Sequence, residues 1–220
     1  MAVVTWRLWK RRNEVIFQNE FTSPLSLMKQ VNQKLQDLKL LQHPTQIIPA
    51  MQEERVEPLQ VWKAPPYGYY KINWDAAVDH KNQRVGIGVI IRDSDGQVIG
   101  TMRKNKFLNP DPHLAEACAA LHAVLLGSNI GLRNIFLEGD ALNVVNAING
   151  VGEHWGQAGM VIVDIQEILN CFNSWFVAYS QRSTNQVAHV LARNALSIEG
   201  ELIELEEIPS CIISMLQNPF

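Results

Sequence analysis

Apolar and polar residues begin to alternate near residue 69, and this pattern limits the folds open to the chain. The stretches 69–75 and 85–91 place an apolar residue at every second position, as a strand with one buried face does. The turn-forming sequence DSDG at 93–96 then leads the chain into a third such stretch, 97–103. The pattern therefore predicts three strands in an antiparallel meander.

Beyond residue 110 the spacing becomes helical and then changes repeatedly between helix and strand. Leu114, Cys118, Leu121 and Leu125 form one stripe of a predicted helix that ends near Gly127. Further helices are predicted at 140–148, 160–172 and 185–196, with short strands at 134–138 and 175–179. Because strands separated by helices favour parallel pairing, the sequence predicts an α/β domain in which helices cover a sheet.

Prolines divide the chain before this domain. Ser23 and Pro24 are a favourable start for an amphipathic helix predicted over 24–41. Five prolines follow between 43 and 66 without lasting periodicity, which is typical of a linker. We therefore expect an N-terminal helical segment with a Pro-rich linker at 1–63. The α/β domain should then occupy 64–198, followed by an acidic linker and a short C-terminal helix at 199–220.

The net charge of −3, from 19 basic and 22 acidic residues, is unevenly distributed. No basic residue follows Arg193, whereas five glutamates do. Such a weak basic footprint argues against tight non-specific binding of nucleic acid. We interpret the cluster Arg103, Lys104 and Lys106 as a solvated strand end, with a phosphate contact as the alternative. The aromatic and basic segment 6–12 is interpreted as a helix with one packed face and one solvated face. The alternative is a surface on which aromatic and basic side chains bind nucleic acid.

Three cysteines, Cys118, Cys171 and Cys211, lie far apart without a CxxC pair, each in an apolar stretch. They are expected to be buried free thiols, which fits a reducing intracellular compartment, either nucleus or cytosol. No apolar run is long enough to span a membrane, and the N-terminus lacks the apolar segment of a secretory signal.

Three carboxylates are placed to meet at one end of the predicted sheet. Asp75 ends the first strand, Asp140 follows the fourth strand at a helix start, and Glu116 lies in the first turn of the first helix. Sites in open α/β sheets form beyond the carboxyl ends of strands. Such oxygen ligands select Mg²⁺ or Mn²⁺, and two such ions can activate water for phosphodiester hydrolysis. Each residue also has a separate structural explanation. Asp75 could form a turn at the strand end, Asp140 could be a helix N-cap, and Glu116 could offset the helix dipole.

The sequence resembles type 1 ribonuclease H in four segments that occur in the family's order. They are KINWDAA (71–77), AEACAALHAV (115–124), LEGDALNVVNAI (137–148) and RSTNQVAHVLARNA (182–195). The chain is most similar to the plant, retrotransposon-derived, reverse-transcriptase-like members of that family. The resemblance implies a five-stranded mixed sheet, an antiparallel meander plus two parallel strands, flanked by helices. It also implies Mg²⁺-dependent hydrolysis of the RNA strand of RNA–DNA hybrids.

Carried over by position, Asp75, Glu116 and Asp140 are the implied metal ligands. His189 stands where active members have a fourth catalytic carboxylate. Imidazole is a poor ligand for Mg²⁺ but acceptable to Mn²⁺, so we interpret His189 as a weak catalytic substitute. The alternative for His189 is a capping or hydrogen-bonding group at the edge of a helix.

Arg182 and Asn185 fall near the mouth of the implied site and are candidate substrate-binding residues. Ala141 and Leu142 stand where active relatives carry polar residues that grip the hybrid. The leading hypothesis is therefore a metal-dependent hybrid endonuclease. The alternative is a weakened or inactive module that binds nucleic acid or a protein partner. An integrase of the same fold would need a late acid, and 185–196 contains none.

Overall fold

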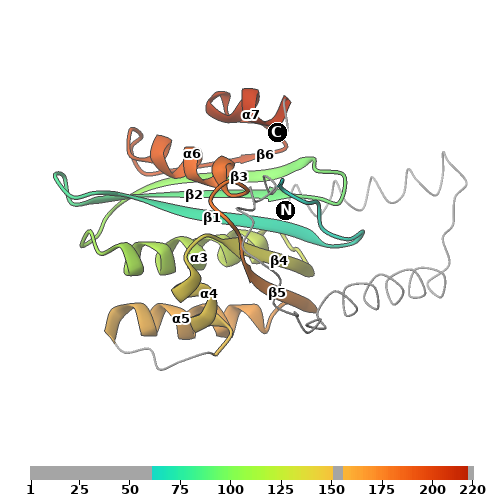
Figure 1. Cartoon of the computed structure of the whole chain (residues 1–220), viewed down its shortest axis with the longest axis horizontal. Helices are drawn as coiled ribbons and strands as arrows, with labels where there is room; N and C mark the ends of the chain where they lie inside the picture. The colour runs from blue at the N-terminus through green and yellow to red at the C-terminus, as the bar shows by residue number, and fades with distance from the viewer. Residues whose placement is uncertain (1–60, 151–155, 218–220) are drawn as a thin grey trace, which may run out of the picture. The chain divides into compact units, whose positions relative to one another are not determined.

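The computed structural model describes residues 61–150 and 156–217 (Figure 1). The described residues belong to one compact unit that starts at Gln60. The predicted helix at 24–41 and the aromatic and basic segment at 6–12 lie outside the described residues, so both stay predictions. Within the described ranges, no helix combines the length and the apolar character needed to cross a lipid bilayer.

A mixed sheet of six strands forms the centre of this unit, in the order β5-β4-β1-β2-β3-β6. The strands are β1 (Tyr70–Asp79), β2 (Arg84–Arg92), β3 (Val98–Phe107), β4 (Asn134–Gly139), β5 (Ser174–Tyr179) and β6 (Glu201–Leu205). β1, β2 and β3 pair antiparallel, whereas β4 and β5 run parallel to β1. The predicted class of fold, a meander joined to two parallel strands, is therefore confirmed.

The sixth strand lies where we expected an acidic linker, so that expectation was wrong at residues 201–205. β6 pairs antiparallel with β3 and places its glutamates beside basic residues. Arg103 Nη2 lies 2.7 Å from Glu204 Oε1, and Lys104 Nζ lies 2.6 Å from Glu201 Oε2. The side chain of Arg103 is only 13% exposed, so the interpretation as a solvated strand end was wrong for this residue. The ion pair of Lys104 is solvent-exposed, and Lys106 is exposed as expected.

Helices cover both faces of the sheet (Figure 1). One layer holds α3 (Pro112–Asn129), α4 (Leu142–Ile148) and α5 (Gly156–Leu169), and the other holds α6 (Gln186–Ala195), a 3₁₀ turn (Ser210–Ile212) and α7 (Ile213–Gln217). α3 begins earlier than its apolar stripe suggests, because Asp111 accepts a hydrogen bond from the N–H of Leu114 at 2.7 Å. Ile212 anchors the C-terminal end, since it packs fully buried against Ile90 and Leu191.

The three cysteines are free thiols, but they are not all buried. Cys118 is buried in α3, and Cys211 is partly buried beside α7. Cys171 is exposed in the turn between α5 and β5, where the neighbouring Phe172 takes the buried position. The expectation of burial was therefore wrong for Cys171.

Helix α6 lies close to the sheet because β2 carries glycines on the facing side. A Cβ atom added at Gly88 would overlap with backbone atoms of Ala188 and Ala192, and one at Gly86 would overlap with Ala192 as well. Gly88 is the cross-strand partner of Asp75. The backbone of α6 therefore packs directly against the backbone of β2 at Gly88, opposite Asp75.

Replacing Gly88 by Ala should lower the free energy of unfolding by about 1–3 kcal/mol, because the added methyl group meets backbone that cannot move aside. Gly100→Ala is the matched control, since its Cβ would lie 3.1 Å from the flexible end of Leu205 and 3.6 Å, an ordinary van der Waals distance, from the carbonyl oxygen of Glu204. Chemical denaturation measures both variants. Equal free energies of unfolding for Gly88→Ala and Gly100→Ala would contradict the close packing of α6 against β2.

Deleting residues 1–60 should leave a domain that unfolds cooperatively, because the compact unit starts at Gln60. Thermal unfolding followed by circular dichroism and calorimetry checks this expectation. Loss of both solubility and cooperative unfolding would show instead that the N-terminal segment completes the core.

Candidate metal centre

Strand β4 ends earlier than its neighbour β1, and this difference in length opens the site. Gly139, the last residue of β4, is paired with Trp74, while β1 continues to Asp79 alongside β2. Asp75 is therefore the first residue of β1 beyond the end of β4, and Asp140 directly follows β4. We expected Asp75 at the end of its strand, but it lies within the strand because β2 still pairs with it.

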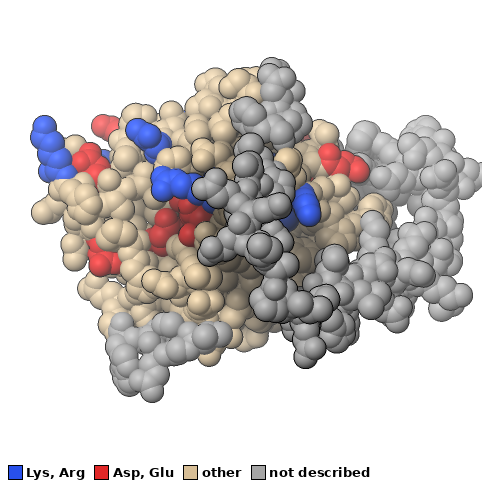
Figure 2. Space-filling model, in the orientation of Figure 1, with Lys and Arg blue, Asp and Glu red and all other residues tan. Residues whose placement is uncertain are grey.

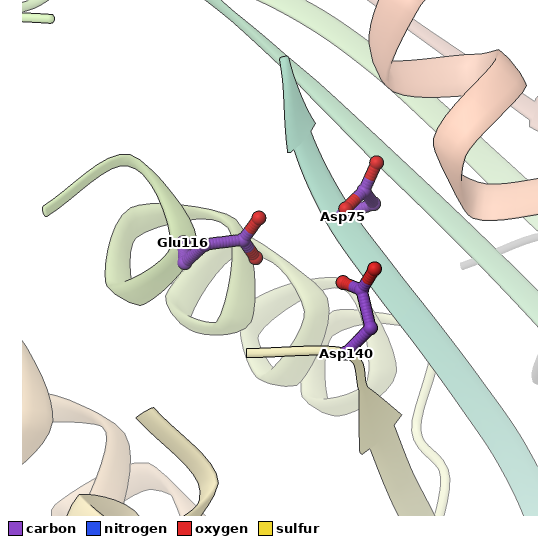
Figure 3. A group of neighbouring side chains, drawn as sticks. All are labelled: Asp75, Glu116 and Asp140. Carbon is purple, nitrogen blue, oxygen red and sulfur yellow. The ribbon is translucent and has the colours of Figure 1, made fainter. Parts of the chain in front are cut away.

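Glu116 reaches the same place from α3. It lies in the second turn of that helix rather than in the expected first turn, which contains no acid. Its Oε1 accepts a hydrogen bond from the N–H of Ala76 at 3.3 Å, and its Oε2 is buried without a hydrogen-bond partner. Figure 3 shows the carboxylates of Asp75, Glu116 and Asp140 turned toward one common space.

The three carboxylates form a cluster in which one oxygen of each lies within 4.8 Å of the others. Among residues 61–150 and 156–217, no other group of acids, histidines or cysteines has this arrangement. The N-cap of α4 is Ala141 rather than Asp140, Glu116 lies outside the first turn, and Asp75 is not in a turn. The separate structural roles considered for these residues therefore do not account for them.

Burial and mutual repulsion make full ionisation of the cluster unfavourable. Burial, followed by the charge of Asp140, raises the pKa of Asp75 to about 6, although the hydrogen bond with His189 opposes this shift. Burial, followed by the charges of Asp75 and Asp140, raises the pKa of Glu116 to about 9. Three negative charges in this space therefore need a cation to neutralise them.

The donor set of the cluster suits a hard divalent cation. Carboxylate oxygens are the ligands that Mg²⁺ and Mn²⁺ prefer. The unpartnered Oε2 of Glu116 is available to such an ion, since no N–H or O–H group occupies it. A bound cation would also remove the repulsion between the carboxylates. The cluster can therefore hold a divalent metal ion.

Side chains at the start of α6 hold β1 beside the cluster. Asn185 is buried, and its Nδ2 donates a hydrogen bond to the carbonyl of Trp74 at 2.8 Å. One helical turn later, His189 Nδ1 lies 2.7 Å from Asp75 Oδ2. His189 thus contacts the cluster but is not one of its three members. The hydrogen bond to Asp75 places His189 beside the cluster, and its catalytic role stays a prediction.

The other candidate residues lie at the surface, outside the group of clustered carboxylates. Arg182 is exposed in the turn before α6, where its carbonyl accepts a hydrogen bond from the N–H of Asn185 at 3.3 Å. Leu142 begins α4 directly after Ala141 and is 50% exposed. Neither Arg182 nor Leu142 belongs to the group of clustered carboxylates.

A buried polar network adjoins the cluster, and its residues were not among the predicted site residues. Lys71 Nζ lies 2.6 Å from Glu138 Oε1, and Asn73 Nδ2 donates to Glu138 Oε2 at 3.4 Å. Asn73 Oδ1 accepts hydrogen bonds from Arg92 Nη2 at 3.0 Å and from Trp62 Nε1 at 3.1 Å. The guanidinium carbon of Arg92 lies 3.6 Å from the centre of the Trp62 ring, a cation–π contact.

This network connects β1 to β4 just before the two strands diverge. Asn73 and Glu138 are direct partners in the parallel register, two residues before Asp75 and Asp140 respectively. The contacts therefore fix the register that brings these two carboxylates together. A sequence signal exists, since Lys71 and Asn73 are polar at positions of the same strand face as Asp75.

The raised pKa of Glu116 predicts that metal-free protein loses stability as the pH rises. The unfolded chain releases this proton near pH 4.5, whereas the folded protein keeps it to about pH 9. The contribution of Glu116 to stability is therefore present at low pH and is lost between these values. Glu116→Gln should thus gain in melting temperature over the wild type from pH 5 to about pH 9 in a chelator.

Differential scanning calorimetry at several pH values measures this difference. Glu167→Gln, an exposed change on α5, is the control and should leave a constant offset. Adding Mg²⁺ at alkaline pH should stabilise the wild type more than Glu116→Gln, because the ion binds the ionised carboxylates. If the difference in melting temperature between Glu116→Gln and the wild type stays constant or shrinks as the pH rises, the pKa of Glu116 is not raised.

The geometry of the site and fold can be compared with known proteins. Residues 73–195, more than half of the chain, match the family described as Reverse transcriptase-like. No curated protein sequence matches the chain. Among solved structures, the fold is similar to that of RNase H1 from the halophilic archaeon Halobacterium salinarum NRC-1. That match has a TM-score of 0.55 and 23% sequence identity, over 59% of this chain and 98% of that chain.

Two other solved structures are also similar in fold. One is the N-terminal RNase H domain of a Mycobacterium tuberculosis protein fused to maltose-binding protein. It has a TM-score of 0.55 and 17% identity, over 59% of this chain and 94% of that chain. The other is LC11-RNase H1, isolated from compost and solved with an RNA/DNA hybrid. It has a TM-score of 0.52 and 18% identity, over 58% of this chain and 96% of that chain.

At these identities the structural likeness establishes the ribonuclease H fold. The segment that matches the family contains Asp75, Glu116 and Asp140. With the matched segment covering more than half of its length, the chain belongs to the reverse transcriptase-like family.

Proposed function

We propose that this protein is a metal-dependent endonuclease that hydrolyses the RNA strand of RNA–DNA hybrids. The convergence of Asp75, Glu116 and Asp140 carries the proposal, because it gathers three oxygen ligands beyond the carboxyl end of β4. The ribonuclease H fold supports it, and a protein of that fold, LC11-RNase H1, has been solved with an RNA/DNA hybrid.

The side chains of the cluster have separate tasks in this proposal. A divalent ion, when bound, supplies activation of the attacking water and stabilisation of the leaving oxygen. Asp75 and Asp140 would hold the ion from neighbouring parallel strands, and Glu116 would add an oxygen from α3. The N–H of Ala76 orients Glu116, and His189 orients Asp75, so both ligands are held before substrate arrives.

The substrate contacts that we propose lie beside α6. Arg182 is exposed in the turn before the helix and is suited to contact a phosphate of the hybrid. Asn185 is buried against Trp74, so it supports this turn from within. On the face in Figure 2, basic and acidic side chains are interspersed among the described residues. Because the chain also has a net charge of −3, affinity would depend on a few local contacts and on the metal ion, and less on a basic surface.

A binding module without catalytic activity is the second candidate. The exposed Leu142 favours it, because an apolar side chain next to Asp140 offers no hydrogen bond to a nucleic-acid backbone. Such a module would retain the fold and bind a nucleic acid or a protein partner.

Cleavage of a labelled RNA–DNA hybrid, with Mg²⁺ and with Mn²⁺ in parallel, tests the proposed activity. Asp75→Asn should lower the rate by about a hundredfold or more, because it removes a charged ligand from the centre. Asp164→Asn, an exposed change on α5, is the matched control and should cleave at the wild-type rate.

The same experiment separates the two candidate functions. The nuclease proposal requires cleavage that a chelator abolishes and that Asp75→Asn lacks. If neither metal supports cleavage while hybrid binding persists and is unaffected by Asp75→Asn, the binding module is the correct assignment.

A further inference from the structure

Strand β6 ends the sheet with an open edge. It is the last strand in the order β5-β4-β1-β2-β3-β6, so in the part of the chain that the structure describes no strand lies beyond it. Three of its five residues, Leu202, Ile203 and Leu205, are 43%, 44% and 36% exposed. At the opposite edge of the sheet, Asn149 Nδ2 donates a hydrogen bond to the carbonyl of Val177 on β5 at 3.1 Å. Among the described residues, no side chain covers the backbone of β6 in this way.

The pairing with β3 determines which backbone groups of β6 point outward. At the two ends of the ladder, the N–H of Asn105 donates to the carbonyl of Gly200 at 2.8 Å, and the N–H of Glu206 donates to the carbonyl of Ile99 at 3.2 Å. Because hydrogen-bonded pairs alternate with non-bonded pairs along an antiparallel ladder, the even-numbered residues of β6 bond to β3. The N–H and C=O groups of the odd-numbered residues therefore point away from the sheet, and these residues are Glu201, Ile203 and Leu205.

The acidic residues of β6 do not protect this edge. Charged side chains on an edge strand usually oppose pairing with another chain, and so do prolines. Here the charges are compensated within the same copy, since Glu201 Oε2 lies 2.6 Å from Lys104 Nζ and Glu204 Oε1 lies 2.7 Å from Arg103 Nη2. The strand contains neither lysine nor proline. It therefore presents unpaired backbone groups and apolar side chains without an uncompensated charge.

We propose that β6 pairs antiparallel with β6 of a second copy of this chain, about a two-fold axis at Ile203, so that the two sheets join into one. In this register Ile203 faces Ile203 of the second copy, and Glu201 faces Leu205 of that copy. Because odd-numbered residues face odd-numbered residues, the outward N–H and C=O groups of both strands all find partners. Each glutamate faces a leucine, since Leu202 faces Glu204 of the second copy.

The neighbouring two-fold registers are less favourable. An axis at Glu204 would place two glutamates face to face, and like charges directly opposite each other destabilise a sheet. An axis at Leu202 would leave the outward groups of Leu205 beyond the paired length of the strand. The edge is therefore complementary to itself in one register, which favours a second copy as the partner, because a two-fold contact presents the same surface twice.

Sedimentation equilibrium of the full chain, at concentrations up to about 1 mM, tests the proposal, since a short edge pairing is a small interface with modest affinity. The wild type should show a monomer–dimer equilibrium. Ile203→Lys and Ile203→Glu should each weaken dimerisation about tenfold or more, because each places two like charges face to face at the axis. An equimolar mixture of the two variants should recover the dimer, because the introduced lysine then faces the introduced glutamate.

Val163→Lys is the matched control, since Val163 is 53% exposed on α5, and it should dimerise as the wild type does. Thermal unfolding verifies that the variants are folded. Asp75→Asn should also dimerise as the wild type does, because β2 and β3 separate β1 from β6. Failure of this proposal is therefore distinguishable from failure of the proposed nuclease function.

Amide hydrogen exchange followed by nuclear magnetic resonance tests the register in the wild type, without any substitution. The N–H groups of Glu201, Ile203 and Leu205 should exchange more slowly as the protein concentration rises. Those of Leu202 and Glu204 should be protected at every concentration, because they bond to β3. A wild type that stays monomeric would overturn the proposal, as would a dimer whose formation leaves these exchange rates unchanged. Failure of the mixed variants to recover the dimer would overturn the axis at Ile203.

Discussion

The unequal lengths of two neighbouring strands determine the arrangement of the rest of the molecule. β4 stops opposite Trp74, whereas β1 continues beside β2 to Asp79. Buried backbone groups that lose a strand partner must find another. Here Asn185 takes the carbonyl of Trp74, and Glu116 takes the N–H of Ala76. The side chains that complete the hydrogen bonding of β1 therefore come from helices on both faces of the sheet, and one of them is also a candidate metal ligand.

A cluster of this kind opposes folding in the absence of a cation, so the surrounding contacts have to hold it together. The ion pair between Lys71 and Glu138 and the stacking of Trp62 on Arg92 lie next to it. Buried ion pairs often add little net stability, but they penalise any register that separates the partners. We interpret the network as a determinant of strand register. It makes the observed alignment of β1 and β4 more stable than alignments that are shifted along the strands.

The sequence was sufficient for the five strands other than β6 and for the carboxylate cluster, and insufficient for the contacts between distant segments. Alternation identified the meander, and the ends of the two predicted strands at 69–75 and 134–138 identified Asp75 and Asp140 as neighbours. The sequence could not show that β1 continues past Asp75, because the length of β1 depends on how far β2 pairs with β1. β6 was missed for a similar reason, since its glutamates find their basic partners on β3, about a hundred residues earlier. The bond between His189 and Asp75 depends on the glycines of β2, which alternation alone does not relate to α6.

The position of β6 has a consequence for how the protein is made. The chain leaves the ribosome from its N-terminus, so the five other strands and α6 are available before β6 has been synthesised. During that interval β3 is an open edge, and open edges invite pairing with other chains. Its row of Arg103, Lys104 and Lys106 makes that edge repel a second nascent copy of itself. Once β6 has been synthesised, its glutamates form ion pairs with Arg103 and Lys104 and cover the edge of β3. The same cations therefore first repel other chains and later stabilise the pairing of β6.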